Sequence, residues 1–125
     1  MRLRYLAHDM AGERSVKVEA LTGYQLTTTI LRQFGNTPEG AKEAKDHLHR
    51  IHGADLLLLD ELGKVKGTPA VLAELFALLD QRHAENLPTI WTSNTYPETF
   101  CASWGEEYSQ PSAGRIIECS LIVRA

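Results

Sequence analysis

Residues 54–61 read Ala-Asp-Leu-Leu-Leu-Leu-Asp-Glu, and this stretch decides the fold. A strand with one exposed face alternates apolar and polar side chains, whereas four consecutive leucines predict a strand that is covered on both faces. Strands of that kind are typical of parallel sheets between helix layers. Asp60 and Glu61 come where the predicted strand ends, and ligands of open α/β sheets bind outside the carboxyl ends of the strands. We therefore expect a binding site at these two carboxylates.

Two adjacent carboxylates at this place suit a nucleotide. One of them can hold Mg²⁺, directly or through water, while its neighbour orients or deprotonates an attacking water molecule. The alternative is that both acids are solvated side chains that only cap the next helix after a buried strand. The stretch by itself leaves both interpretations open.

The composition is that of an ordinary globular domain. Of the 125 residues, 43% are apolar and 23% are charged, and the net charge is −3, so no overall basic character indicates a nucleic-acid binder. The sequence has no apolar run of the roughly 18 residues that a membrane span needs, and its start lacks the apolar core of a secretory signal. Cys101 and Cys119 match no metal-ligand spacing. We expect one cytoplasmic domain without a membrane span.

Predicted strands and helices alternate along the rest of the chain. Two helices are expected to begin at Thr37-Pro38 and Thr68-Pro69, where a capping hydroxyl precedes a proline at the first helical position. This alternation predicts an α/β domain with a mainly parallel sheet. The expected order is a helix over residues 1–11, a strand over 16–21, a short helix ending at Gly35, a helix over 38–53, the leucine strand, a helix from Pro69 to Asn86, a strand over 89–94, a short helix over 96–104, one or two helical turns over 115–119 and a strand over 121–123.

Spacing also assigns several side chains to the core. Trp91 and Trp104 are expected in the core rather than as platforms for base stacking. Arg82 is expected to be structural, paired with Asp80 or Glu85. One face of the short second helix is expected to be buried, and its apolar residues are Leu26, Ile30, Leu31 and Phe34.

Three segments, in this order, resemble motifs of the ATPase domain of AAA+ proteins of the DnaC/IstB group, which are helicase loaders and transposition helpers. Residues 56–63, Leu-Leu-Leu-Leu-Asp-Glu-Leu-Gly, resemble the Walker B strand and the glycine that follows it. Residues 87–94, Leu-Pro-Thr-Ile-Trp-Thr-Ser-Asn, resemble the strand that ends in the sensor 1 asparagine, here Asn94. Residues 114–118, Gly-Arg-Ile-Ile-Glu, are similar to the segment with the arginine finger, here Arg115.

The resemblance, which extends over residues 1–123, implies a three-layer P-loop NTPase fold that binds ATP and Mg²⁺. It implies that Asp60 serves Mg²⁺ and that Glu61 serves the attacking water. Asn94 would sense the water or the γ-phosphate of the bound nucleotide, and Arg115 would stabilise the charge on a phosphoryl group in a neighbouring subunit. An intact member would form a homo-oligomer and act in DNA replication or transposition on single-stranded DNA, with a replicative helicase or a transposase as its partner.

Two of these roles have structural alternatives. Asn94 also suits the start of a turn that ends at Pro97, because asparagine favours such positions. Arg115 also fits a surface arginine on a short helix. Thr92 and Ser93 are expected at most to support the site.

One motif of the family is missing from the sequence. The family's domain begins with a strand and a Gly-x-x-x-x-Gly-Lys-Thr phosphate loop, whose backbone N–H groups and lysine hold the phosphates. No such pattern occurs in the 125 residues, and residues 1–11 look like the remainder of the helix that follows that loop. We therefore expect a single incomplete AAA+-like domain over residues 1–125, which hydrolyses ATP only if the phosphate loop is supplied. The alternative is a catalytically inactive remnant or binding protein that pairs with a complete ATPase subunit and offers Arg115 to it.

Overall fold

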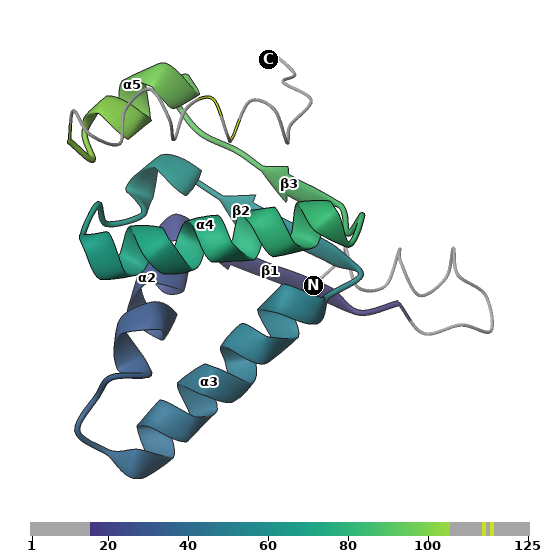
Figure 1. Cartoon of the computed structure of the whole chain (residues 1–125), viewed down its shortest axis with the longest axis vertical. Helices are drawn as coiled ribbons and strands as arrows, with labels where there is room; N and C mark the ends of the chain where they lie inside the picture. Colours follow the sequence, from purple (N-terminus) through teal and green to yellow (C-terminus); the bar gives the residue numbers. More distant parts are fainter. Residues whose placement is uncertain (1–15, 106–113, 115, 117–125) are drawn as a thin grey trace.

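The computed structural model describes residues 16–105, 114 and 116. Strands and helices alternate along these residues, as the sequence predicts (Figure 1). The third strand ends at Trp91 rather than at Asn94. In chain order the elements are β1 (Val18–Thr22), α2 (Gly23–Arg32), α3 (Pro38–Gly53), β2 (Leu56–Asp60), the 3₁₀ helix η1 (Leu62–Lys64), α4 (Pro69–Ala84), β3 (Thr89–Trp91) and α5 (Pro97–Ala102).

The three described strands form one parallel sheet in the order β1-β2-β3. Leu57 of β2 lies opposite Glu19 of β1 and Thr89 of β3, so the leucine strand is the central strand of the three. Helices α2 and α3 connect β1 with β2, and α4 connects β2 with β3, as crossovers between parallel strands require. The predicted α/β fold class with a parallel sheet is confirmed.

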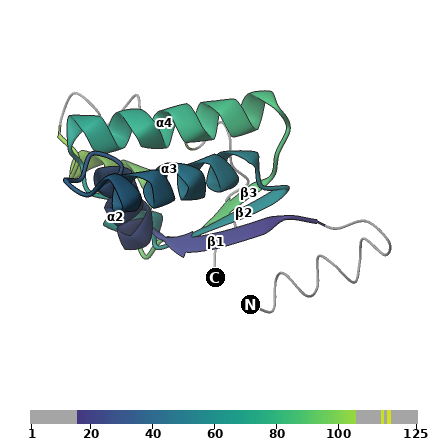
Figure 2. The same cartoon turned by 90° about the horizontal axis from the view of Figure 1, so that it is seen from below.

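Burial alternates along β2. Leu57 and Leu59 are fully buried, whereas Leu56 and Leu58 are half-buried. Figure 2 shows α3 and α4 on the same face of the sheet, and their apolar side chains join Leu57 and Leu59 in one core cluster. The described elements therefore show the predicted cover on one face of β2 and not on the other.

Helix α2 begins behind a reciprocal pair of capping hydrogen bonds. The Gln25 N–H donates to Thr22 Oγ1 (3.0 Å), and the Thr22 N–H donates to Gln25 Oε1 (2.9 Å). These bonds satisfy two backbone donors that would otherwise be left open at the helix start. β1 therefore passes into α2 without an intervening loop.

The buried face of α2 is narrower than predicted. Leu26 and Ile30 are buried, as expected, but Leu31 is 43% exposed and Phe34 is 67% exposed, so the prediction is wrong for these two residues. Leu31 follows Ile30 directly and points about 100° away from it around the helix. Phe34 lies beyond the last residue of the helix, Arg32.

The proline starts of α3 and α4 are confirmed, because Pro38 and Pro69 are the first residues of their helices. Thr37 and Thr68 occupy the N-cap positions, but neither hydroxyl accepts a capping hydrogen bond. The predicted hydroxyl caps are therefore wrong. Proline still suits the first position, because it lacks an N–H that would need a partner there.

Arg82 of α4 is structural, as predicted, but its five hydrogen bonds go to neutral acceptors rather than to Asp80 or Glu85. Its side chain is 1% exposed. Nη1 donates to the carbonyl oxygens of Ala54 (2.7 Å), Ile51 (3.2 Å) and His52 (3.2 Å) at the end of α3. Nη2 donates to the Pro88 carbonyl oxygen (2.8 Å), and Nε donates to Thr89 Oγ1 (2.8 Å). One guanidinium group thus joins the end of α3 to the start of β3. A cation also suits the negative end of the α3 dipole.

Several predictions fall outside the described residues. They concern the helix over 1–11, the strand over 121–123 and, apart from the helical Ile116, the turns over 115–119. None of the helices in the described part is long and apolar enough to cross a membrane.

Candidate functional site

The carboxyl ends of β2 and β3 bring three polar residues together. Asp60 is the last residue of β2, and Glu61 follows it. Thr92 comes directly after β3, which is the parallel neighbour of β2. Because neighbouring parallel strands end at the same edge of a sheet, residues far apart in the sequence meet there.

The Thr92 hydroxyl connects the two acidic residues. It donates a hydrogen bond to Asp60 Oδ1 and accepts one from the Glu61 N–H (3.0 Å). The Thr92 backbone is fixed as well, because its N–H donates to the Leu59 carbonyl (3.0 Å) and its carbonyl accepts from the Leu62 N–H (2.8 Å). Both the side chain and the backbone of Thr92 are therefore hydrogen-bonded to one segment, residues 59–62.

Glu61 has an unusual backbone conformation for a residue with a side chain. Its φ and ψ are both 56°, in the left-handed helical region, which costs on the order of 1–3 kcal/mol for residues other than glycine. Hydrogen bonds maintain the turn, since the Lys64 N–H donates to the Glu61 carbonyl (2.9 Å) and the Glu61 N–H is bound by Thr92. The direction in which the Glu61 side chain leaves the backbone is thus determined by its surroundings.

The start of α2 packs against the same turn. A Cβ atom added to Gly23 would lie 2.4 Å from the Glu61 carbonyl oxygen and 3.1 Å from the Val65 nitrogen. Both neighbours are backbone atoms, which cannot move aside without opening the turn. Only glycine at position 23 allows the start of α2 to approach the Glu61 turn this closely. The start of α2, directly after β1, is therefore part of the site.

The loop after η1 is anchored on two sides. The Lys66 N–H donates to Thr27 Oγ1 of α2 (3.0 Å), and Trp104 Nε1–H donates to the Val65 carbonyl (3.1 Å). Trp104 is buried, as predicted, and packs edge-on against Phe100, with ring centroids 5.4 Å apart. The loop thus has a fixed backbone beside the acidic pair.

The predicted site residues differ in where the structure places them. Asp60 and Glu61 lie together at the carboxyl end of β2, with exposed side chains. Asn94 lies in the bend after β3, and no hydrogen bond joins its exposed side chain to either acid within the described residues. Arg115 lies outside the described residues. The catalytic roles of Glu61, Asn94 and Arg115 stay predictions.

Sequence reasoning gave Thr92 no more than a supporting place, yet Thr92 is the residue that contacts both acids. The available signal was its position, directly after an apolar run on the neighbouring strand. The neighbouring Ser93 has a local role, because its Oγ accepts from the Thr95 N–H (3.2 Å). The register of β2 and β3, which sets Leu59 opposite Trp91, decides that Thr92 and not Ser93 meets Asp60.

The Asp60 carboxylate at this edge is a suitable ligand for a magnesium ion. Thr92 binds Oδ1 of Asp60, and Oδ2 has no hydrogen-bond partner in the part of the chain that the structure describes. A single carboxylate oxygen that faces solvent is the ligand that a partly hydrated Mg²⁺ takes in nucleotide sites. Asp60 is therefore compatible with the predicted metal role.

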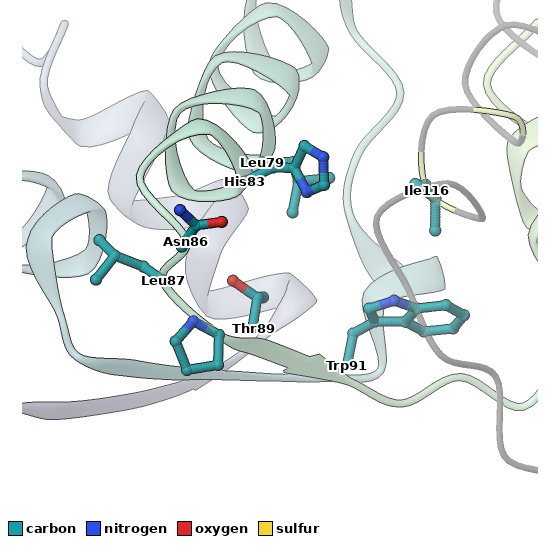
Figure 3. Close-up of a pocket in the computed structure, with 8 residues that line it drawn as sticks. Leu79, His83, Asn86, Leu87, Thr89, Trp91 and Ile116 are labelled. Carbon is teal, nitrogen blue, oxygen red and sulfur yellow. The ribbon is translucent and has the colours of Figure 1, made fainter.

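A separate pocket of about 300 Å³ runs along β3 and the end of α4 (Figure 3). Neither Asp60 nor Glu61 lines it. Ile116 faces Trp91 across this pocket (Figure 3). Its lining residues are Leu79, His83, Asn86, Leu87, Pro88, Thr89, Trp91 and Ile116.

Sequence comparisons identify no family for this chain. No model of a known protein family matches it, and no curated protein matches it by sequence. Solved structures do match it in fold.

One similar structure is described as a DNA replication initiation factor, with a TM-score of 0.65 and 17% identity over 88% of this chain. A second is DnaA from Aquifex aeolicus bound to AMPPCP, with a TM-score of 0.67 and 15% identity over 88% of this chain. A third is the replication initiator DnaA bound to AMPPCP and single-stranded DNA, with a TM-score of 0.65 and 16% identity over 86% of this chain. The matches span only 31%, 32% and 30% of those chains, respectively.

At these identities the likeness establishes the fold and nothing beyond it. The chain has an α/β fold with a parallel sheet, similar to that of replication initiators. The likeness does not single out the DnaC/IstB group that the sequence motifs resemble.

Proposed function

We propose that this chain is part of an ATP-binding AAA+ module that acts in DNA replication or transposition. The observation that carries the proposal is the site at the carboxyl ends of β2 and β3, where Asp60 and Glu61 lie beside Thr92. Two proteins with a similar fold bind AMPPCP, an analogue of ATP. One of them also binds single-stranded DNA.

In this proposal the chain's residues divide the work. Asp60 holds the magnesium ion, whose charge would neutralise the phosphate oxygens of the bound nucleotide. Glu61 orients the attacking water, because the left-handed turn fixes the direction of its Cα–Cβ bond at the sheet edge. Asn94 senses the water or the γ-phosphate, and Arg115 acts on the nucleotide of a neighbouring copy. Single-stranded DNA and a replicative helicase or transposase are the proposed partners.

A direct test is titration of the purified chain with a fluorescent ATP analogue and Mg²⁺. We expect saturable binding that the Asp60→Asn variant loses, because the amide keeps the shape of the carboxylate without its charge. Asp46→Asn is a matched control, since Asp46 is an exposed acid on α3. Binding that is equal in wild type and Asp60→Asn would contradict the metal role of Asp60.

A second candidate function follows from one feature of the sequence. No Gly-x-x-x-x-Gly-Lys-Thr pattern occurs in the 125 residues, so no residues of that motif hold the phosphates. The chain would then be a catalytically inactive binding protein that offers Arg115 to a complete ATPase subunit. Absence of nucleotide binding by the folded chain up to millimolar concentrations would favour this candidate over the first.

A further inference from the structure

We propose that Thr92 sets the cation preference of the site by holding one oxygen of the Asp60 carboxylate in a hydrogen bond. The inference rests on the proposed role of Asp60 as a cation ligand. It assigns to Thr92 a specificity-determining role at that ligand.

The direction of the hydrogen bond follows from proton counting. A threonine hydroxyl has one proton to donate and lone pairs that accept. The Glu61 N–H can only donate, so it uses a lone pair of Thr92 Oγ1 (3.0 Å). The hydroxyl proton then belongs to the second contact, with Asp60 Oδ1. One lone pair of Oδ1 is thus engaged by the hydroxyl, whereas Oδ2 has no hydrogen-bond partner among the described residues and is the oxygen more open to an ion.

The hydroxyl also has little freedom to leave. Both backbone polar groups of Thr92 are bound to the β2 side, through the Leu59 carbonyl (3.0 Å) and the Leu62 N–H (2.8 Å). Rotation of the side chain away from Asp60 would leave the Glu61 N–H without this partner, in a turn that already has a left-handed conformation. An ion that takes Oδ1 as well as Oδ2 must therefore share Oδ1 with a hydrogen bond that the surroundings maintain.

The two common divalent ions differ in this need. Mg²⁺ takes one oxygen from a carboxylate and keeps several waters, whereas Ca²⁺ accepts more oxygens and often takes both from one carboxylate. With Oδ1 bound to Thr92, Asp60 can offer the single oxygen that Mg²⁺ uses. The bidentate contact that favours Ca²⁺ competes with the Thr92 hydroxyl. Thr92 therefore shifts the preference of the site toward Mg²⁺ and against Ca²⁺.

The test uses metal ions alone, with the full chain. Mn²⁺ broadens the amide NMR signals of nearby residues, and Mg²⁺ or Ca²⁺ then competes for the site. We expect broadening centred on Asp60 and Glu61 in wild type. In Thr92→Val, which keeps the branched shape but lacks the hydroxyl, the affinity ratio of Ca²⁺ to Mg²⁺ should rise by about two- to ten-fold, the range that one net hydrogen bond is worth. Thr92→Ser should keep the wild-type ratio.

The matched control is Thr95→Val, at an exposed threonine in the bend after β3, which should leave the ratio unchanged. If Thr92→Val does not fold, Thr92→Ala removes the same hydroxyl without the branched side chain and replaces it. An unchanged ratio in the folded variant, or Mn²⁺ broadening in wild type that is centred elsewhere, overturns the inference. These measurements use no nucleotide, so a failure of ATP binding would contradict the proposed function without affecting this test.

Discussion

Arg82→Met is the substitution for which the structure predicts the clearest loss of stability. Methionine keeps a long, flexible apolar stem, so the packing of α4 is largely retained. The guanidinium group is lost, and with it five hydrogen bonds to the end of α3 and the start of β3. The substitution therefore tests whether one buried cation joins these two segments.

The size of the effect can be worked out from the acceptors. The bonds to the Ile51 and Ala54 carbonyls are buried, and a buried polar group that loses its partner costs about 1–3 kcal/mol. Two such carbonyls give a loss of about 2–6 kcal/mol. Removal of the buried charge recovers part of the lost free energy. Burial disfavours the Arg82 cation and lowers its pKa, and the charges of Asp55 and Glu85 oppose this only in part. We expect the free energy of unfolding to fall by about 3 kcal/mol.

Urea unfolding followed by circular dichroism measures this loss as a shift of the midpoint at constant slope. Arg32→Met is the matched control, because the Arg32 side chain is 57% exposed and its ion pair with Glu43 is long, at 3.8 Å. An exposed pair of this kind is worth about 0.5 kcal/mol or less. A loss of less than about 1 kcal/mol in Arg82→Met would refute the reasoning that the Arg82 hydrogen bonds stabilise the contact between the end of α3 and the start of β3.

Other substitutions test the site and its surroundings. Gly23→Ala should destabilise by about 1–3 kcal/mol, because its Cβ would meet the Glu61 carbonyl. Gly53→Ala, where the added atom meets nothing within 4 Å, should be neutral or stabilising in the same urea assay. Glu61→Gly should raise the free energy of unfolding by about 1 kcal/mol, since glycine adopts the left-handed conformation at no steric cost; a loss of stability would contradict the strain.

Cys101 gives a prediction about pH. Burial, with help from the charge of Glu98, raises the pKa of the Cys101 thiol from 9.0 to about 12. A thiol reagent at about pH 8 should therefore modify Cys101, followed by peptide mass mapping, far more slowly in the native chain than in the urea-unfolded chain. The unfolded state loses this proton at lower pH than the folded state, so stability should also fall as the pH rises from about 9 to about 12. Equal labelling rates in the two states would show that the thiol is accessible.

The sequence was informative where local rules act alone. Proline after threonine marked the starts of α3 and α4, and the leucine run with its two acids marked the central strand and the edge of the sheet. It was less informative where three-dimensional contacts decide. Nothing local distinguishes Leu31, which is exposed, from Ile30, which is buried, because which side of a short helix meets the sheet depends on its partners.

The contacts of Thr92 are also decided by three-dimensional structure and not by local sequence. Thr92, Ser93 and Asn94 are three consecutive polar residues after an apolar strand, and family resemblance favoured the asparagine. The choice among them is made by strand register, which places Leu59 opposite Trp91 and brings the next residue of β3 to Asp60. Register is a property of two segments that are about thirty residues apart in sequence, so no reading of one segment supplies it.

The contacts around Glu61 give a reason to connect this geometry with function. A charged residue in the left-handed region breaks a local rule of backbone preference, and the structure maintains it with contacts from three separate segments. Gly23 leaves room for the Glu61 carbonyl, and the Lys64 N–H donates to that carbonyl. Thr92 Oγ1 accepts from the Glu61 N–H. Local rules are broken and compensated most often where a side chain must point in one direction. A glycine at position 61 would adopt this conformation at no steric cost, so the carboxylate is the part of residue 61 that the proposed water-orienting role requires.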